Sequence, residues 1–187
     1  MPERSETGHT DGPLLVVIGA PGAGKTRVGK RVARILGVPF VDTDRRVVQR
    51  HGPIAQMFHA NGESHFRRME RLEVARALAE HGVVSLGGGA ILDPATQADL
   101  AHLRVALMTV SADAVQSRIG TKRPLLADGG IAAWERLVEA RREIYERLAT
   151  RSFDSSSRPI DGIAAEMADW VRSDGVASDR IRPPETR

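Results

Sequence analysis

Residues 19–26 read GAPGAGKT and match the pattern G-x-x-x-x-G-K-[ST], which binds the phosphates of a nucleotide. The glycines let successive backbone N–H groups curl around a β-phosphate, and the following helix N-terminus adds a partial positive charge. Lys25 is placed to reach the β- and γ-phosphates, and the Thr26 hydroxyl is placed to ligate Mg²⁺. The pattern therefore predicts a nucleotide and Mg²⁺ site; its candidate residues are Gly22, Ala23, Gly24, Lys25, Thr26 and Arg27.

The acceptor of any phosphoryl group must be inferred from other residues, because ATPases, GTPases and small-molecule kinases share this loop. The sequence DTD places Asp42 and Asp44 at the end of a predicted strand over 39–44, where alternate residues project from one face. In open α/β sheets, ligands bind beyond such strand ends. An acid there would accept a proton from a substrate hydroxyl or complete a Mg²⁺ shell through water. The alternative is a pair of solvated acids in a turn.

Two arginines are candidates for binding an anionic acceptor. Arg67 and Glu70 are three residues apart on a predicted helix and can pair, although a surface pair alone contributes little stability. Arg141 falls in the middle of an apolar stripe, where a guanidinium is costly unless it is paired. The alternative for Arg141 is a side chain that snorkels from the edge of the stripe. The stripe consists of Trp134, Val138, Tyr145 and Leu148.

The elements that position these residues alternate between strand-like apolar runs and helical patterns, which predicts an α/β fold with a mainly parallel sheet. Gly37 is placed to end the first helix, and Leu72, Ala75 and Ala79 are the predicted apolar stripe of a long one. We expect strands over 14–19, 39–44, 83–88 and 105–110, with 152–157 as a short strand or loop. We expect helices after the phosphate loop, over 53–60, 63–80, 112–119, 132–149 and 160–172, and from about residue 93.

Composition limits the other classes of function. The chain has no cysteine, which excludes disulfides and thiolate metal sites, and no apolar run near the ~20 residues that span a bilayer. Few aromatic residues and interleaved charges argue against a nucleic-acid partner. The polar, aperiodic segments 1–12 and 173–187 are expected to be disordered tails around one domain over 13–172. We expect a cytoplasmic monomer.

Six motifs in order make the chain resemble shikimate kinase over roughly residues 13–170. The motifs are GAPGAGKT, VDTD, FRRME, SLGGGA, KRPLL and ARREIY. The resemblance implies a nucleoside-monophosphate-kinase-like fold, with three α/β/α layers, a five-stranded parallel sheet and a mobile lid at about 120–131. It also implies transfer of the γ-phosphoryl group of ATP, with Mg²⁺, to the 3-hydroxyl of shikimate, on the route to chorismate and the aromatic amino acids.

The resemblance further implies roles for the acceptor-side residues. Asp44 resembles the acid that binds the acceptor hydroxyl and acts as general base, and Asp42 the acid near the Mg²⁺ shell. Arg67 and Arg141 resemble the pair that binds the shikimate carboxylate, with Glu70 orienting Arg67. The glycines of the triplet, Gly87, Gly88 and Gly89, correspond to backbone beside the substrate ring.

On the nucleotide side, Lys25 and the lid residue Arg123 resemble the groups that act on the transferring phosphate. Arg118 resembles an arginine that flanks adenine, and Arg158 another nucleotide-side residue. Two features depart from a general pattern. Only four residues separate Arg118 from Arg123, which is short for the family, and the third strand ends in SLGG without a Walker-B aspartate. The missing aspartate agrees with the resemblance and disfavours a generic ATPase.

The glycine triplet raises its own expectation. A strand end without side chains leaves room for a ring against the backbone, whose N–H groups can bond ring oxygens. A tight turn would need one or two glycines rather than three. We therefore expect a side chain at Gly88 or Gly89 to damage shikimate binding before it damages the fold.

Two other classes of function compete with this hypothesis. One is another small-molecule kinase of the same fold. A gluconate kinase gives no reason for DTD together with FRRME and GGGA, and a nucleotide kinase usually has a longer lid and a base-binding region that this sequence does not show. The other is a regulatory nucleotide-binding module without catalysis. The presence of Lys25, Thr26, Asp44, Arg67, Arg123 and Arg141 together argues against it.

Overall fold

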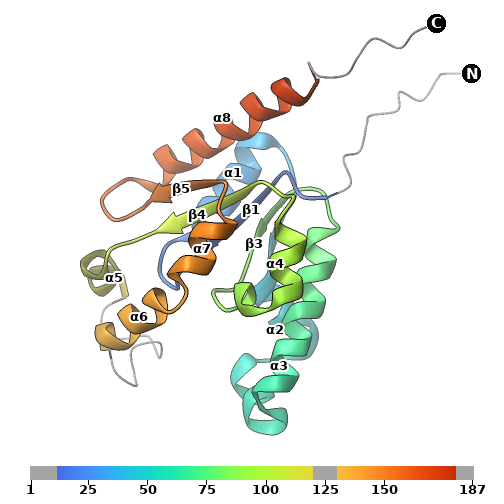
Figure 1. The fold of residues 1–187 in the computed structure, drawn as a ribbon, viewed down its shortest axis with the longest axis vertical. Helices are drawn as coiled ribbons and strands as arrows, with labels where there is room; N and C mark the ends of the chain where they lie inside the picture. Colours follow the sequence, from blue (N-terminus) through green and yellow to red (C-terminus); the bar gives the residue numbers. More distant parts are fainter. Residues whose placement is uncertain (1–11, 120–129, 180–187) are drawn as a thin grey trace, which may run out of the picture.

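Five parallel strands in the order β2-β3-β1-β4-β5 form the central sheet of the computed structural model, which describes residues 12–119 and 130–179 (Figure 1). β1 lies between β3 and β4, with Val16 opposite Val84 on one side and Val105 on the other. This confirms the predicted five-stranded parallel sheet. The strands are β1 Leu15–Gly19, β2 Phe40–Asp42, β3 Val83–Ser85, β4 Val105–Thr109 and β5 Arg151–Asp154.

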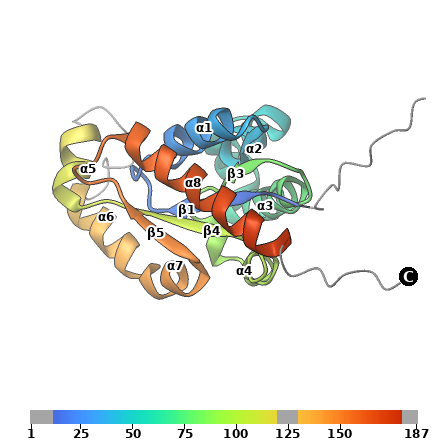
Figure 2. The same cartoon turned by 90° about the horizontal axis from the view of Figure 1, so that it is seen from above.

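Helices cover both faces of the sheet and complete an α/β/α arrangement (Figure 2). α1 and α8 pack together on one face, whereas α3, α4 and α7 pack on the other. The helices are α1 Lys25–Leu36, α2 Thr43–His51, α3 Ile54–Leu78, α4 Pro94–Leu100, α5 Ala112–Ile119, α6 Gly130–Glu139, α7 Arg142–Leu148 and α8 Ile160–Asp179, with a short 3-10 helix η1 Ala90–Leu92.

The central strand β1 explains why its sequence is apolar throughout. Its side chains alternate, so that Leu15 and Val17 enter the core beneath α1 and α8, while Val16 and Ile18 enter the core beneath α3. All four are at most 1% exposed. A strand buried on both faces has no polar position, which is typical of a parallel sheet covered by two helical layers.

Gly37 ends α1 as predicted. Its φ of 70° and ψ of 30° lie in the left-handed region, and its N–H donates to carbonyls of the last helical turn. Glycine adopts this conformation without the steric penalty that a β-carbon brings. The chain then turns directly into β2, which carries the first acid of the DTD segment to the edge of the phosphate loop.

The second acid of DTD lies on a helix, so the prediction that both acids alternate along a strand is wrong. β2 ends at Asp42, whose Oδ1 accepts the Arg45 N–H at 3.1 Å and caps the N-terminus of α2. Such a cap starts the helix at Thr43 and places Asp44 in its first turn. Asp44 therefore projects from α2.

The long helix α3 buries a different face from the predicted stripe. Leu72 is 39% exposed, whereas Glu70, Glu73, Val74 and Ala77 are buried. The buried positions keep the helical spacing of three and four residues, but two of them hold carboxylates that pair with arginines. A hydrophobic pattern misses such a face. α3 also includes the predicted helix over 53–60, with a kink at Gly62, where φ is 77°.

The predicted helix over 132–149 is two helices. α6 ends at Glu139 and α7 begins at Arg142, because Arg141 adopts φ −111° and ψ −4° between them. The apolar stripe therefore does not continue along one axis, and Arg141 sits at the break rather than in its middle. The break leaves the guanidinium free to reach the end of β3.

The last helix extends beyond residue 172, where we expected the domain to end. α8 continues to Asp179, so the expected disordered tail over 173–187 is helical in its first part. The chain meets no proline before Pro183, and one glycine costs a helix only about 1 kcal/mol. Residues 1–11 and 180–187 lie outside the described residues. Over 12–119 and 130–179, no helix combines the length and apolar character needed to cross a membrane.

Candidate active site

Three segments that carry the predicted site residues meet at the carboxyl edge of the sheet. The phosphate loop follows β1, Asp42 ends β2, and the glycine triplet follows β3. Because β2, β3 and β1 are neighbours in the sheet, these three ends lie side by side. This edge is where ligands of open parallel sheets bind.

The phosphate loop is shaped by two glycines in the left-handed region, Gly22 with φ 86° and Gly24 with φ 90°. Lys25 folds back over the loop, and its Nζ donates to the carbonyls of Gly19 at 2.8 Å and Ala20 at 3.0 Å. Burial lowers the pKa of Lys25 to about 8, opposed by the nearby carboxylates of the DTD segment. The lysine is thus held at the loop, within the electrostatic reach of the acids.

Thr26 and Asp42 are joined directly, with the Thr26 hydroxyl donating to Asp42 Oδ2 at 2.6 Å. A hydroxyl and a carboxylate are hard oxygen ligands of the kind that Mg²⁺ prefers. Within the described residues, no three histidine or acidic side chains gather as a metal site of their own. Mg²⁺ in phosphoryl-transfer sites is held by one or two protein oxygens together with the substrate phosphates, so this pair fits that ion.

Asp44 faces the glycine triplet from the first turn of α2. A β-carbon built on Gly87 would lie 2.1 Å from Asp44 Oδ1, far inside van der Waals contact. The Gly87 N–H donates to the buried Thr43 hydroxyl at 3.0 Å, which ties the triplet to α2. Burial raises the pKa of Asp44 to about 6, with Asp42 adding to the shift and Lys25 opposing it.

Arg67 projects from α3 onto the last glycine of the triplet. Its Nη1 donates to Glu70 Oε2 at 2.7 Å, so the predicted pairing is present and is anchored by a carboxylate that is only 4% exposed. Glu63 Oε1 lies 3.2 Å from Arg67 Nη2. A β-carbon on Gly89 would come within 2.5 Å of Arg67 Nη1, so a side chain there requires the end of Arg67 to move.

Arg141 binds the backbone of the middle glycine. Its Nη1 donates to the Gly88 carbonyl at 2.8 Å, and the buried Tyr145 hydroxyl donates to the same oxygen at 2.9 Å. Gly88 also packs against Pro21 of the phosphate loop, which a β-carbon would meet at 3.3 Å. The Arg141 guanidinium is therefore hydrogen-bonded to the main chain of the triplet. Each glycine of the triplet contacts a different part of the site.

The arginines predicted for the nucleotide side have hydrogen-bond partners other than the glycine triplet. Arg118, near the end of α5, donates to the carbonyls of Ser155 and Ser156, the latter at 3.2 Å. Arg158 pairs with Glu166 Oε2 at 2.6 Å. Arg27 is exposed on α1. Arg123 and most of the predicted lid lie outside the described residues.

Three residues that sequence reasoning did not assign to the site support the two glycine-rich segments. Tyr145 binds the Gly88 carbonyl, the Trp134 Nε1 donates to the Pro21 carbonyl at 2.8 Å, and the Ser155 hydroxyl donates to the Ala23 carbonyl at 3.0 Å. The run of serines after β5 is the one sequence signal that could have indicated such a contact. The sequence pattern assigned Tyr145 and Trp134 to an apolar stripe and so to the hydrophobic core.

A phosphate-binding loop after the central strand, with an acid and two arginines on glycine backbone beside it, defines a P-loop kinase. The acid lies against the Gly87 backbone, and the Lys25 ammonium and the Thr26 hydroxyl lie at the phosphate loop. A gluconokinase from Sinorhizobium meliloti shares this fold, with a TM-score of 0.62 at 20% sequence identity, over 92% of this chain and 98% of that one.

Residues 21–172 match the family model described as shikimate kinase. A shikimate kinase of Thermobifida fusca is 47% identical over 160 residues, which cover 83% of this chain and 93% of the relative. A shikimate kinase from Acinetobacter baumannii, solved in complex with shikimate, superposes with a TM-score of 0.78 at 25% identity, over 88% of this chain and 95% of that one. The chain belongs to the shikimate kinase family and is an ATP-dependent kinase of aromatic biosynthesis.

Proposed function

We propose that this chain transfers the γ-phosphoryl group of ATP to the 3-hydroxyl of shikimate where the phosphate loop meets the glycine triplet, with Asp44 as general base. The observation that carries this assignment is the contact between Asp44 and the Gly87 backbone, one strand away from Lys25. An acid held against bare backbone beside a phosphate loop has the position that a proton acceptor for a bound hydroxyl requires.

Arg67 and Arg141 bind the shikimate carboxylate from opposite elements, α3 and the α6–α7 break. Both guanidinium groups lie on backbone of the triplet, Arg67 on Gly89 and Arg141 on the Gly88 carbonyl. Arginine is suited to this role, because its planar fork of N–H donors matches a carboxylate. With the carboxylate bound at one end, the ring lies along the glycines and presents a hydroxyl to Asp44.

Asp44 is ionised at neutral pH, because its pKa of about 6 lies below 7. In the transfer step, the shikimate oxygen forms a bond to the γ-phosphorus while the bond from that phosphorus to the β–γ bridging oxygen breaks. The hydroxyl proton passes to the Asp44 carboxylate, and ADP leaves with the bridging oxygen. A raised pKa makes the carboxylate a better proton acceptor than a solvated aspartate.

On the nucleotide side, Lys25 exchanges the carbonyls of Gly19 and Ala20 for the β- and γ-phosphates. Thr26 and Asp42 would hold Mg²⁺, because their hydroxyl and carboxylate oxygens lie at the phosphate loop and are the kind of ligand that Mg²⁺ prefers. Bound Mg²⁺ supplies neutralisation of phosphate charge. We also assign Arg118 and Arg158 to the nucleotide side and Arg123 to the lid. The cytoplasmic location and the monomeric state remain predictions.

A coupled ADP-release assay with Mg-ATP tests the proposed acceptor. We expect turnover that depends on shikimate and is absent with gluconate or nucleoside monophosphates. Shikimate-independent ATP hydrolysis, or faster turnover with another acceptor, would contradict the assignment. The same panel of acceptors distinguishes a kinase from a regulatory module. A regulatory module would bind ATP but would release no ADP with any of the acceptors.

The Asp44→Asn variant tests the general base. Asparagine keeps the shape of the side chain but accepts no proton, so we expect loss of transfer by a factor of about 100 or more while ATP still binds. Single-turnover rates measure transfer, and calorimetric titration measures ATP binding. Turnover close to that of the unchanged protein would remove Asp44 from this role.

A further inference from the structure

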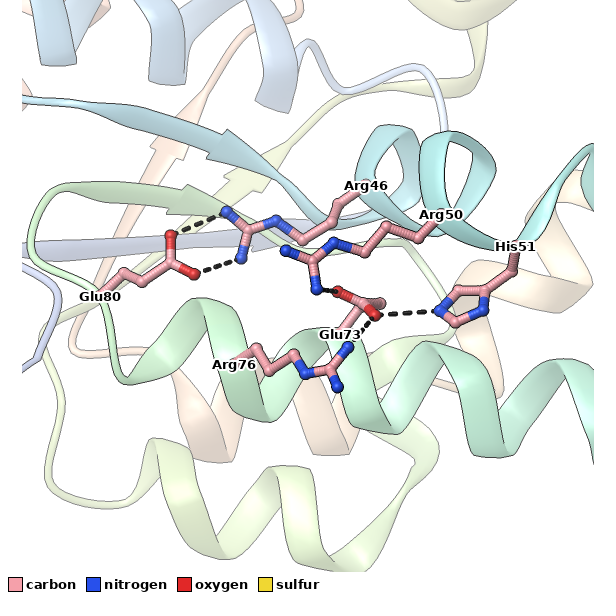
Figure 3. A network of polar contacts seen from close by, with 6 residues as sticks. All are labelled: Arg46, Arg50, His51, Glu73, Arg76 and Glu80. Carbon is pink, nitrogen blue, oxygen red and sulfur yellow. Dashed lines mark hydrogen bonds and ion pairs between the residues drawn. The ribbon is translucent and has the colours of Figure 1, made fainter.

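Glu73 is a fully buried carboxylate that lies outside the proposed reaction site. It projects from α3, and its Oε1 accepts hydrogen bonds from His51 Nε2 at 2.9 Å and Arg76 Nη1 at 2.7 Å (Figure 3). Its Oε2 lies 3.6 Å from Arg50 Nη1 and has no hydrogen bond to any described residue. Burial alone would raise the pKa of Glu73, but His51, Arg50 and Arg76 together lower it.

The partners of Glu73 come from two different helices. His51 and Arg50 occupy the last turn of α2, whereas Arg76 lies on α3, one turn after Glu73 itself. Only the contacts of Glu73 with His51 and Arg50 can therefore hold α2 against α3. Arg76 pairs with a residue of its own helix, as three-residue spacing allows, and adds compensating charge without joining the helices.

A buried ion pair contributes little net stability, because desolvation offsets the attraction between the charges. An apolar side chain of similar volume would fill the space between α2 and α3 at less cost, as Val47, Met57 and Phe66 do nearby. The hydrophobic effect is non-directional, so apolar contact specifies the pairing of helical turns through shape alone. A hydrogen-bonded carboxylate instead fixes which turn of α2 faces which turn of α3.

The two helices carry opposite sides of the proposed acceptor site. Asp44 is in the first turn of α2, seven residues before His51, at a distance of about 10 Å along the helix. On α3, Glu70 lies one turn before Glu73 and holds Arg67. The position of the proposed base relative to the proposed carboxylate clamp is therefore set by how α2 packs on α3.

We propose that Glu73 is a positioning residue for the acceptor site, which it serves by holding the last turn of α2 against α3 through His51 and Arg50. The proposal rests on the assignment of Asp44 and Arg67 to the shikimate site. It predicts that weakening the link between the helices affects shikimate and leaves ATP binding at the phosphate loop unchanged. A role in stability alone would lower the melting temperature without this selectivity.

The test compares three variants of the whole chain: Glu73→Gln and His51→Gln, which weaken the link between helices, and Arg76→Gln, which removes a hydrogen bond within α3. We expect the first two to raise the KM for shikimate about tenfold with the KM for ATP within about twofold, since a displacement of about 1 Å can cost up to a hundredfold. The Arg76→Gln variant should keep both KM values near those of the unchanged protein. Melting temperatures measured in parallel show that each variant is folded.

The double variant Glu73→Gln with His51→Gln sharpens the comparison. If both residues act through one contact, its KM for shikimate should be no higher than that of either single variant. Equal effects on both substrates, an effect of Arg76→Gln as large as that of His51→Gln, or a lowered melting temperature with unchanged KM would overturn the proposal. Absence of shikimate turnover in the unchanged protein would instead overturn the proposed function.

Discussion

A β-carbon on Gly87 would lie 2.1 Å from Asp44 Oδ1, so the glycine after β3 and the acid on α2 define each other's position. None of the three triplet glycines has a positive φ, which means that backbone conformation does not require them. The glycines are required instead because side chains of the site approach the backbone closely. The triplet is therefore glycine because Asp44, Arg67 and Pro21 lie against it, and each position has its own consequence.

The Gly87→Ala variant should lose transfer more than any other alanine in the triplet. The new methyl group must displace Asp44 or the strand end, and a displacement of this size can lower kcat about a hundredfold. ATP binding, measured by calorimetric titration, should stay within about twofold because the phosphate loop is untouched. A variant with normal kcat would show that Asp44 does not need this contact.

The Gly89→Ala variant should raise the KM for shikimate without unfolding the protein. Its methyl group would meet Arg67 Nη1 at 2.5 Å, and the flexible end of an arginine can move aside. Moving it weakens carboxylate binding, for which we expect an increase in KM of about tenfold, in line with the loss of one charge-assisted hydrogen bond.

The Gly88→Ala variant should raise the KM for shikimate less than Gly89→Ala does. Its β-carbon would meet the Pro21 ring at 3.3 Å, a contact that a small shift relieves, so its effect should be the smaller one. Steady-state kinetics and melting temperature for both variants separate a binding defect from a folding defect. Unchanged KM for shikimate in both variants would contradict the placement of the ring along the triplet.

Activity should fall with acidity as Asp44 becomes protonated. Burial raises the pKa of Asp44 to about 6, and only the ionised form accepts a proton. We expect kcat/KM for shikimate to be level above about pH 7 and to fall about tenfold per unit below about pH 6. A profile that stays level down to about pH 4.5, near the ordinary range of aspartate, would contradict this environment for Asp44.

The same pKa predicts the sign of a stability effect. The folded-state pKa of Asp44 lies above its ordinary value of 3.8, so the folded protein binds this proton more tightly than the unfolded chain. The stability contributed by the protonated form is fully present below the pKa of Asp44 in the unfolded chain. It is lost as the pH rises through the folded-state pKa of about 6. Above that pH the ionised group lowers the free energy of unfolding. Asp44→Asn should therefore not lower the melting temperature at neutral pH.

The Arg141→Ala variant should raise the KM for shikimate at least about tenfold and change the KM for ATP much less, because it removes a charged donor from the carboxylate. Arg142→Ala is the matched control, since Arg142 is exposed and pairs with Glu139 on the surface. Steady-state kinetics with each substrate varied in turn measures the difference. Equal effects of Arg141→Ala on both substrates would remove Arg141 from the carboxylate clamp.

The phosphate loop could be predicted from the sequence because its parts are contiguous and lie between a strand and a helix. Lys25 and Thr26 needed no tertiary information, and the order of apolar runs indicated the parallel sheet correctly. The position of Asp44 was harder to predict, because residues 42–44 can either continue a strand or begin a capped helix. The hydrogen bond that the Arg45 N–H donates to Asp42 Oδ1 decides that competition in favour of the helix.

Two features of the structure were beyond sequence patterns. The pairing of Arg67 with Glu70 was predicted, but the burial of Glu70 and Glu73 on α3 was not, because a pattern that treats carboxylates as exposed assigns the wrong face. Tyr145 reaches the Gly88 carbonyl across 57 residues of chain, and nothing local to either residue indicates that contact. Distant pairing of polar groups depends on the completed fold, which is why an aromatic residue in an apolar stripe read as core.

The oxygen that fixes Arg141 belongs to the main chain of Gly88, and main-chain atoms are the same whatever residue is encoded. Substitution at position 88 changes the space around that oxygen but never deletes it, so the attachment point of the clamp is protected from point mutation. Variation can act only on the two donors, Arg141 and Tyr145. An enzyme engineered to accept a ring with another anionic group would therefore be altered at the donors, with the acceptor left in place as a constant of the scaffold.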